Sequence, residues 1–273
     1  MSPLVARRAR LTIALLLVSA CAYGIWRALD IALRPVGLYT GVLLLTLVFF
    51  LTLFNARKKL PFLPLLRAST WLQAHIYLGW FCVFIFLLHI DFRVPKGALE
   101  LTLAIVFCLV VASGAFGLFI SRWLPLVMAR SGEPLIYERM PAHRRKIRES
   151  VEHLIRNAEA ETASSTLGDF YFERLRYFFD HSPGALHALA GPEMRYHRLT
   201  AELNTLTRYL NSREQEIAAE LHGWIEEKRN LDSQYSAQRL LKLWLFVHIL
   251  FTYALIVLGT AHGIIAALYA GLI

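Results

Sequence analysis

Four histidines lie inside apolar runs of this sequence, and their spacing repeats. His75 and His89 are fourteen positions apart in one run, and His248 and His262 are fourteen positions apart in another. An α-helix rises about 1.5 Å and turns about 100° per residue, so fourteen residues cover about 21 Å and end about 40° short of four full turns. Each pair is therefore predicted to lie on one face of its helix, with one imidazole near each end.

These residue types point to metal or proton chemistry. A histidine in hydrocarbon is costly, and it marks a functional site when it occurs there. Neutral imidazole is a good ligand for iron, and a haem takes one axial ligand on each side of its plane. We predict that His75 with His248, and His89 with His262, ligate two b-type haems. A haem-free proton relay through the same side chains is the alternative.

Five segments are long and apolar enough to position these side chains in a bilayer. The composition agrees, because 56% of the residues are hydrophobic. We therefore predict an all-α fold, an integral membrane bundle of five transmembrane helices. The predicted spans are Leu11–Leu29, Pro35–Phe54, Leu72–Ile90, Ala98–Ile120 and Leu241–Leu268.

The net charge of +9 is concentrated around the predicted spans. Residues 121–240 hold 17 Lys and Arg and 17 Asp and Glu, so the membrane portion carries the whole excess. This indicates membrane-flanking charge and no nucleic-acid partner. Basic residues cluster before span one, between spans two and three, and after span four, and the positive-inside rule makes that side cytoplasmic. The N-terminus is then cytoplasmic and the C-terminus lies on the opposite side of the membrane.

This topology brings the histidines to matching depths. Spans three and five run in the same direction, and His75 and His248 each lie a few residues into their spans, near the cytoplasm. His89 and His262 lie near the opposite surface. Two facing helices would present two stacked imidazole pairs. The glycines around them either admit a flat cofactor or only let helices pack closely; they are Gly37, Gly41, Gly79, Gly114, Gly117 and Gly259.

The chain is predicted to have three parts. Residues 1–120 contain spans one to four, residues 121–240 form a cytoplasmic helical insertion, and residues 241–273 contain span five. The insertion has no phosphate-binding loop and no metal-spaced cysteines. Its aromatic stretch FYFERLRYFF, 170–179, is predicted to form the core of a small helical layer, and 181–193 is predicted to break the helices.

Charged residues at the ends of the spans are candidates for contacts to the cofactors. Haem propionates favour basic partners, and Arg67 and Arg122 are candidates on the cytoplasmic side, with Arg93 and Lys96 on the outer side. Asp91 follows the His89 turn and is the candidate for proton exchange with a bound quinone. The alternative is that these charges are solvated and only set the topology.

The histidine pattern resembles that of the dihaem membrane cytochromes b. Cytochrome b of quinol–cytochrome c oxidoreductases and the membrane domain of ferric reductases and NADPH oxidases carry similar pairs. The stretches RASTWLQAHIYLG, LLHIDF, SGAFGLFISRWLP and EEKRNLDSQYSAQ also resemble a bacterial family of dihaem membrane proteins. The resemblance carries over to His75, His89, His248 and His262. The long stretch before span five departs from the oxidase pattern, and no flavin or nicotinamide domain follows that span.

These observations predict an electron-conducting subunit of an oxidoreductase complex. It would bind two haem b groups and a quinone, and carry electrons between the quinone pool and a partner redox subunit. That partner would be an iron–sulfur, flavin or c-type cytochrome protein, because the chain has no second redox motif of its own. Membrane lipid is the other predicted partner. A transmembrane ferric or oxygen reductase is one alternative, and a haem-free channel or transporter is the other.

Overall fold

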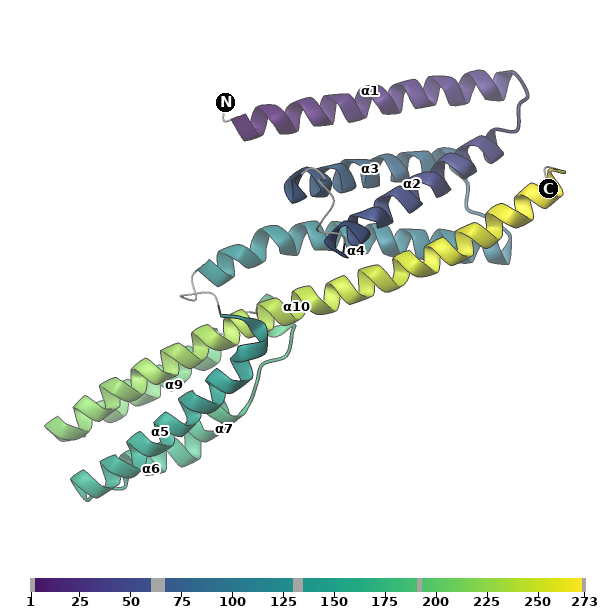
Figure 1. Cartoon of the computed structure of the whole chain (residues 1–273). Helices are drawn as coiled ribbons and strands as arrows, with labels where there is room; N and C mark the ends of the chain where they lie inside the picture. Colours follow the sequence, from purple (N-terminus) through teal and green to yellow (C-terminus); the bar gives the residue numbers. More distant parts are fainter. Residues whose placement is uncertain (1–2, 60–66, 130–134, 191–192, 272–273) are drawn as a thin grey trace. The chain divides into compact units, whose positions relative to one another are not determined.

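The computed structural model describes residues 3–59, 67–129, 135–190 and 193–271, and within these it contains helices and no strands. Figure 1 labels the helices in chain order. The first four long helices are α1 (Pro3–Ile31), α2 (Val36–Lys59), α3 (Ala68–His89) and α4 (Ala98–Ala129). The remaining elements are η1 (Tyr137–Arg139), α5 (Met140–Thr162), α6 (Thr166–Phe170), η2 (Tyr171–Leu175), α7 (Arg176–Asp180), α8 (His187–Ala190), α9 (Glu193–Thr207) and α10 (Ser212–Tyr269).

The five predicted spans are confirmed as long apolar helices. Four of them coincide with α1 to α4, and the fifth is the C-terminal half of α10. Many large apolar side chains on α1 face outward, among them Ile13, Leu16, Leu17 and Ile25. Hydrocarbon suits such a surface and water does not. The chain is thus a multi-pass membrane protein with lipid around its helices.

The last helix differs from its prediction in length. The sequence placed the start of the fifth span at Leu241, but α10 begins at Ser212 and continues for 58 residues without interruption. No proline lies in this stretch, so nothing in the local backbone ends the helix at the membrane surface. Its first turn is closed by a capping box, in which Asn211 and Glu214 each accept a hydrogen bond at 2.9 Å from the other's backbone N–H.

Internal contacts divide the chain into two compact units. One comprises Met1–Ala115 with Val247–Ile273, and the other comprises Phe116–Phe246. In the first unit α2 packs along α3, and α1 contacts both. Its core includes Phe86 and Phe107, whose rings stack with centroids 4.2 Å apart. The parts predicted from the sequence, with boundaries at residues 120 and 240, were defined by the membrane surface. Their placement relative to a membrane stays a prediction.

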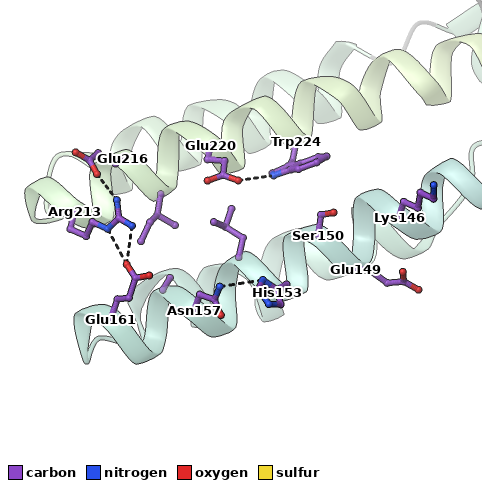
Figure 2. Close-up of a pocket in the computed structure, with 13 residues that line it drawn as sticks. Lys146, Glu149, Ser150, His153, Asn157, Glu161, Arg213, Glu216, Glu220 and Trp224 are labelled. Atoms are coloured by element: carbon purple, nitrogen blue, oxygen red, sulfur yellow. Dashed lines mark hydrogen bonds and ion pairs between the residues drawn. The ribbon is translucent and has the colours of Figure 1, made fainter.

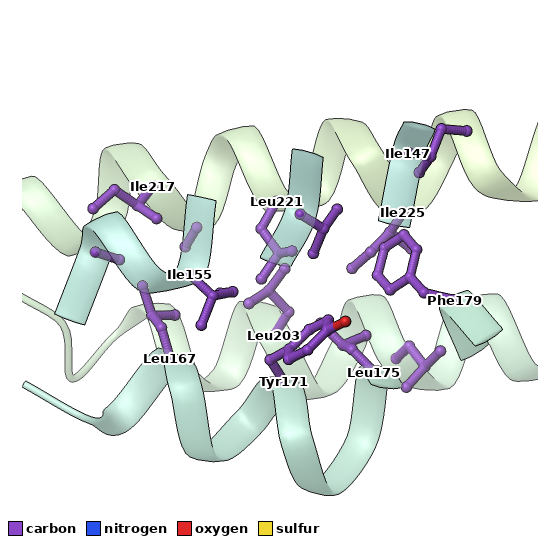
Figure 3. Packing of buried hydrophobic residues seen from close by; sticks show 14 of the residues in the cluster. Ile147, Ile155, Leu167, Tyr171, Leu175, Phe179, Leu203, Ile217, Leu221 and Ile225 are labelled. Carbon is purple, nitrogen blue, oxygen red and sulfur yellow. The ribbon is translucent and has the colours of Figure 1, made fainter. Parts of the chain in front are cut away.

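The second unit is a helical layer with its own core (Figure 3). Tyr171, Leu175 and Phe179 follow one another at intervals of four along η2 and α7, and all three are buried. They pack with apolar side chains of α5, α9 and the N-terminal half of α10. The prediction that the aromatic stretch forms a core is confirmed in part, because Tyr171 and Phe179 are buried whereas Phe172 and Tyr177 are exposed. The break predicted at 181–193 is confirmed for the described residues of this range, which contain the one-turn α8 before α9 begins at Glu193.

Candidate functional site

The first unit brings the two predicted histidine pairs together. The ring centroids of His75 on α3 and His248 on α10 are 6.4 Å apart, with the rings inclined at 71°. The ring centroids of His89 on α3 and His262 on α10 are also 6.4 Å apart, with an inclination of 85°. We call the pair His75 and His248 the His248 level, and the pair His89 and His262 the His89 level. At each level α3 and α10 contribute one ring each, with the same separation.

The separation of 6.4 Å can be compared with what metal binding requires. A metal–nitrogen bond is about 2.0–2.1 Å and a ring nitrogen lies about 1.1 Å from its ring centre, so two imidazoles on opposite sides of one metal ion have centres about 6.3 Å apart. A direct hydrogen bond between ring nitrogens would bring the centres to about 5.2 Å. Both pairs therefore have the spacing of two axial ligands and are too far apart for a nitrogen–nitrogen hydrogen bond.

His89 is held by a neighbouring residue pair on α2. The hydroxyl Oγ1 of Thr40 lies 3.1 Å from Nδ1 of His89. The next residue, Gly41, allows the ring to approach the backbone, because a Cβ at this position would lie 3.0 Å from Cε1 of His89. Any side chain at position 41 would press on the imidazole.

His248 is held in the same way from α4. The hydroxyl Oγ of Ser113 lies 2.9 Å from Nδ1 of His248. The next residue is again a glycine, Gly114, and a Cβ there would lie 3.7 Å from Cε1 of His248. One histidine of each pair thus contacts a hydroxyl residue followed by glycine. The backbone of Leu51, on α2, is a polar neighbour of a third ring, that of His75.

Thr40 and Ser113 are the site residues that the sequence analysis missed. Each is a hydroxyl residue directly before a glycine in an otherwise apolar span, and this dipeptide repeat was the available signal. Hydroxyls in spans commonly bond only their own helix, so the signal by itself does not point to a histidine.

Of the other glycines, some leave room for a cofactor and one allows close helix packing, which are the two roles considered from the sequence. A Cβ at Gly79, one turn beyond His75, would meet nothing within 4 Å, which leaves space beside the ligand face. A Cβ at Gly259 would touch only Leu45, at 3.5 Å. Gly117 serves helix packing instead, because a Cβ there would lie 1.9 Å from the ring of Trp244.

The charged candidates all lie on exposed positions. Arg67 precedes the first turn of α3, Arg122 lies on α4, and Lys96 lies in the loop before α4. Asp91 forms an exposed ion pair with Arg93 at 3.3 Å. Asp91 itself has a left-handed backbone, with φ of 51°, in the turn that ends α3 directly after His89. The structure leaves the proposed propionate and quinone roles as predictions.

The second unit contains a groove of about 720 Å³ between α5 and α10 (Figure 2). Arg213 crosses it, and its guanidinium pairs with Glu161 at 2.9 Å and with Glu216 at 2.6 Å. The indole of Trp224 donates to Glu220 at 3.4 Å. These charges satisfy one another, and none of the predicted site residues lines the groove.

Each imidazole pair offers two candidate metal ligands. Among the described residues no three or more His, Cys, Asp or Glu side chains gather around a point. Two protein ligands suffice for a haem, since the macrocycle itself provides the remaining nitrogen ligands. Comparison with known proteins adds no relative: no protein-family model, curated protein or solved structure matches the chain.

Proposed function

We propose that this chain is a dihaem b-type cytochrome that conducts electrons across a membrane, between the quinone pool and a partner redox protein. The observation that carries the proposal is the repeated pair of imidazoles at 6.4 Å, contributed by the same two membrane helices. Two ligands of one metal ion would have that spacing, and the contact of Thr40 with Nδ1 of His89 leaves Nε2 of His89 for a metal.

The residues present fit a haem better than a bare metal ion. Each level offers two neutral nitrogen ligands, whereas protein-bound transition-metal ions usually have four or more ligands. A Cβ at Gly79, on the predicted ligand face, would meet nothing within 4 Å, which is consistent with a planar group beside this face. When bound, haem supplies one-electron redox chemistry, and the protein supplies ligand geometry, spacing and a low-dielectric environment.

The orientation belongs to the same proposal. The excess of basic residues around one set of loops supports a cytoplasmic N-terminus, a cytoplasmic location for residues 121–240 and a periplasmic C-terminus. The setting would be a bacterial cytoplasmic membrane. Electrons would enter or leave through an iron–sulfur, flavin or c-type cytochrome partner, and Asp91 remains the candidate for proton exchange with quinone.

A visible spectrum of the purified full-length protein tests the haem assignment. We expect a Soret band and two haem b per chain in a pyridine haemochrome assay. His75→Ala and His89→Ala should each lose one haem, because each removes one axial ligand. His197→Ala, at an exposed position in the second unit, is the matched control and should keep both. A protein that lacks the Soret band when isolated from haem-replete cells would contradict the proposal and favour a proton relay.

The quinone link needs a separate measurement. Oxidation of a soluble quinol by the isolated haem-loaded protein, followed as haem reduction, would support it. Reduction of ferric chelates or oxygen, with no quinol reaction, would favour a transmembrane reductase instead.

A further inference from the structure

We infer that Thr40 and Ser113 are positioning residues for the haem ligands: each contacts Nδ1 of one histidine in each pair and fixes the orientation of that ring. The inference rests on the proposed haem binding. It assigns the orientation of His89 and His248 to residues on two other helices, α2 and α4.

The hydrogen-bond contacts of Thr40 indicate which ring nitrogen of His89 carries the hydrogen. A hydroxyl has one hydrogen to donate. Thr40 Oγ1 lies 2.8 Å from the carbonyl oxygen of Val36 and 3.2 Å from that of Gly37, and carbonyl oxygens only accept. The hydroxyl hydrogen is therefore committed to its own helix. Towards His89 the oxygen of Thr40 can only accept, so Nδ1 of His89 is the donor.

This donor assignment fixes the tautomer. In neutral imidazole one nitrogen carries the hydrogen and the other has the free lone pair. With the hydrogen on Nδ1, Nε2 of His89 is left with the lone pair that a metal needs. Thr40 is only 8% exposed, so water does not compete strongly for this bond.

The second contact repeats the first on an independent pair of helices. Ser113 Oγ lies 2.9 Å from Nδ1 of His248, and Gly114 follows it as Gly41 follows Thr40. The hydroxyl orients the ring in both contacts, and at Gly41 the absence of a Cβ also leaves room for Cε1 of His89 beside the helix backbone. Because one repeat acts at each level, each haem would have one ligand fixed in this way.

The test is a redox titration and a haem assay of Thr40→Val, which keeps the shape of the side chain and removes the hydroxyl. Loss of such an outer hydrogen bond commonly weakens metal binding about 10–100-fold. We expect Thr40→Val to retain the haem of the His89 level about 10-fold less tightly and to raise its reduction potential, since the imidazole becomes a poorer electron donor. The other haem should keep its potential.

Two further variants separate a hydrogen-bond effect from a general loss of stability. Thr40→Ser keeps the hydroxyl and should restore the wild-type potential. Thr46→Val, on the same helix, removes a hydroxyl that bonds only the Val42 carbonyl, at 2.8 Å, and should change nothing. Ser113→Ala should shift the potential of the His248 level instead, which gives an independent result if Thr40→Val does not fold.

Different results would overturn the proposed function and the positioning role. A wild-type protein without haem would overturn the proposed function itself. A wild-type protein with two haems, in which both Thr40→Val and Ser113→Ala leave haem content and potentials unchanged, would overturn only the positioning role.

Discussion

Substitution of Gly41 by alanine is the sharpest steric test of the candidate site. The added Cβ would lie 3.0 Å from Cε1 of His89, whereas ordinary carbon contacts are about 3.5–4.0 Å. The imidazole must therefore move by about 0.5 Å or more, away from the Thr40 hydroxyl that orients it. The helix backbone cannot yield easily, because α2 packs along α3 at this position.

The size of the effect follows from packing energetics. Inserting a methyl group into a well-packed site costs about 1–3 kcal/mol. At about 1.4 kcal/mol per tenfold, this corresponds to haem binding at the His89 level that is weaker by about 5–150-fold. Alanine also favours the helix over glycine by about 1 kcal/mol, which adds to the stability of the fold and not to haem binding. The variant should thus fold normally and lose haem selectively.

Two glycine variants provide matched controls for the same assay. A Cβ at Gly37, one turn earlier on α2, would meet nothing within 4 Å, so Gly37→Ala should keep both haems. Gly114→Ala would place its Cβ 3.7 Å from Cε1 of His248, an ordinary contact, and should also keep both. The measurement is haem content per chain, with a redox titration to identify the missing component. If Gly41→Ala matches Gly37→Ala in both, the close approach of α2 to His89 does not control ligand position.

Three further predictions concern the second unit, with thermal unfolding of the purified protein followed by circular dichroism. Lys228→Met removes the buried ammonium that pairs with Asp232, while Arg144 still pairs with Asp232 at 3.3 Å, so the variant should lose about 1.5–3 kcal/mol of stability, which an unchanged melting temperature would contradict. Asn211→Ala removes the cap of α10 and should cost about 1 kcal/mol, and a wild-type melting temperature would argue against the capping box. The hydrogen bond from the backbone of Asn211 lowers the pKa of Glu214, so the bond stabilises fully above the ordinary carboxyl pKa and its contribution is lost as pH falls through the lowered value. Glu214→Gln should flatten that part of the pH profile relative to wild type, and an unchanged profile would assign the acid sensitivity elsewhere.

The sequence alone was enough to predict the membrane helices and to place each histidine pair on one face of its helix. Hydropathy over about twenty residues is a local property, and so is the periodicity that places His75 and His89 on one face. The recurrence of Tyr171, Leu175 and Phe179 every four residues is also a local helical pattern, so it is visible in the sequence. The boundaries were less well determined, because α10 continues through a stretch whose composition changes without any residue that ends a helix.

The residues of other helices that contact the imidazoles could be identified only from the packing of the helices. Thr40 meets His89 across 49 positions of sequence, and Ser113 meets His248 across 135. No helical period relates residues so far apart, and a hydroxyl in a span commonly donates to its own backbone, and whether its oxygen also accepts from a histidine depends on the neighbouring helix. The candidate ligands could thus be predicted from spacing within one helix, whereas the residues that contact them depend on which helices pack together.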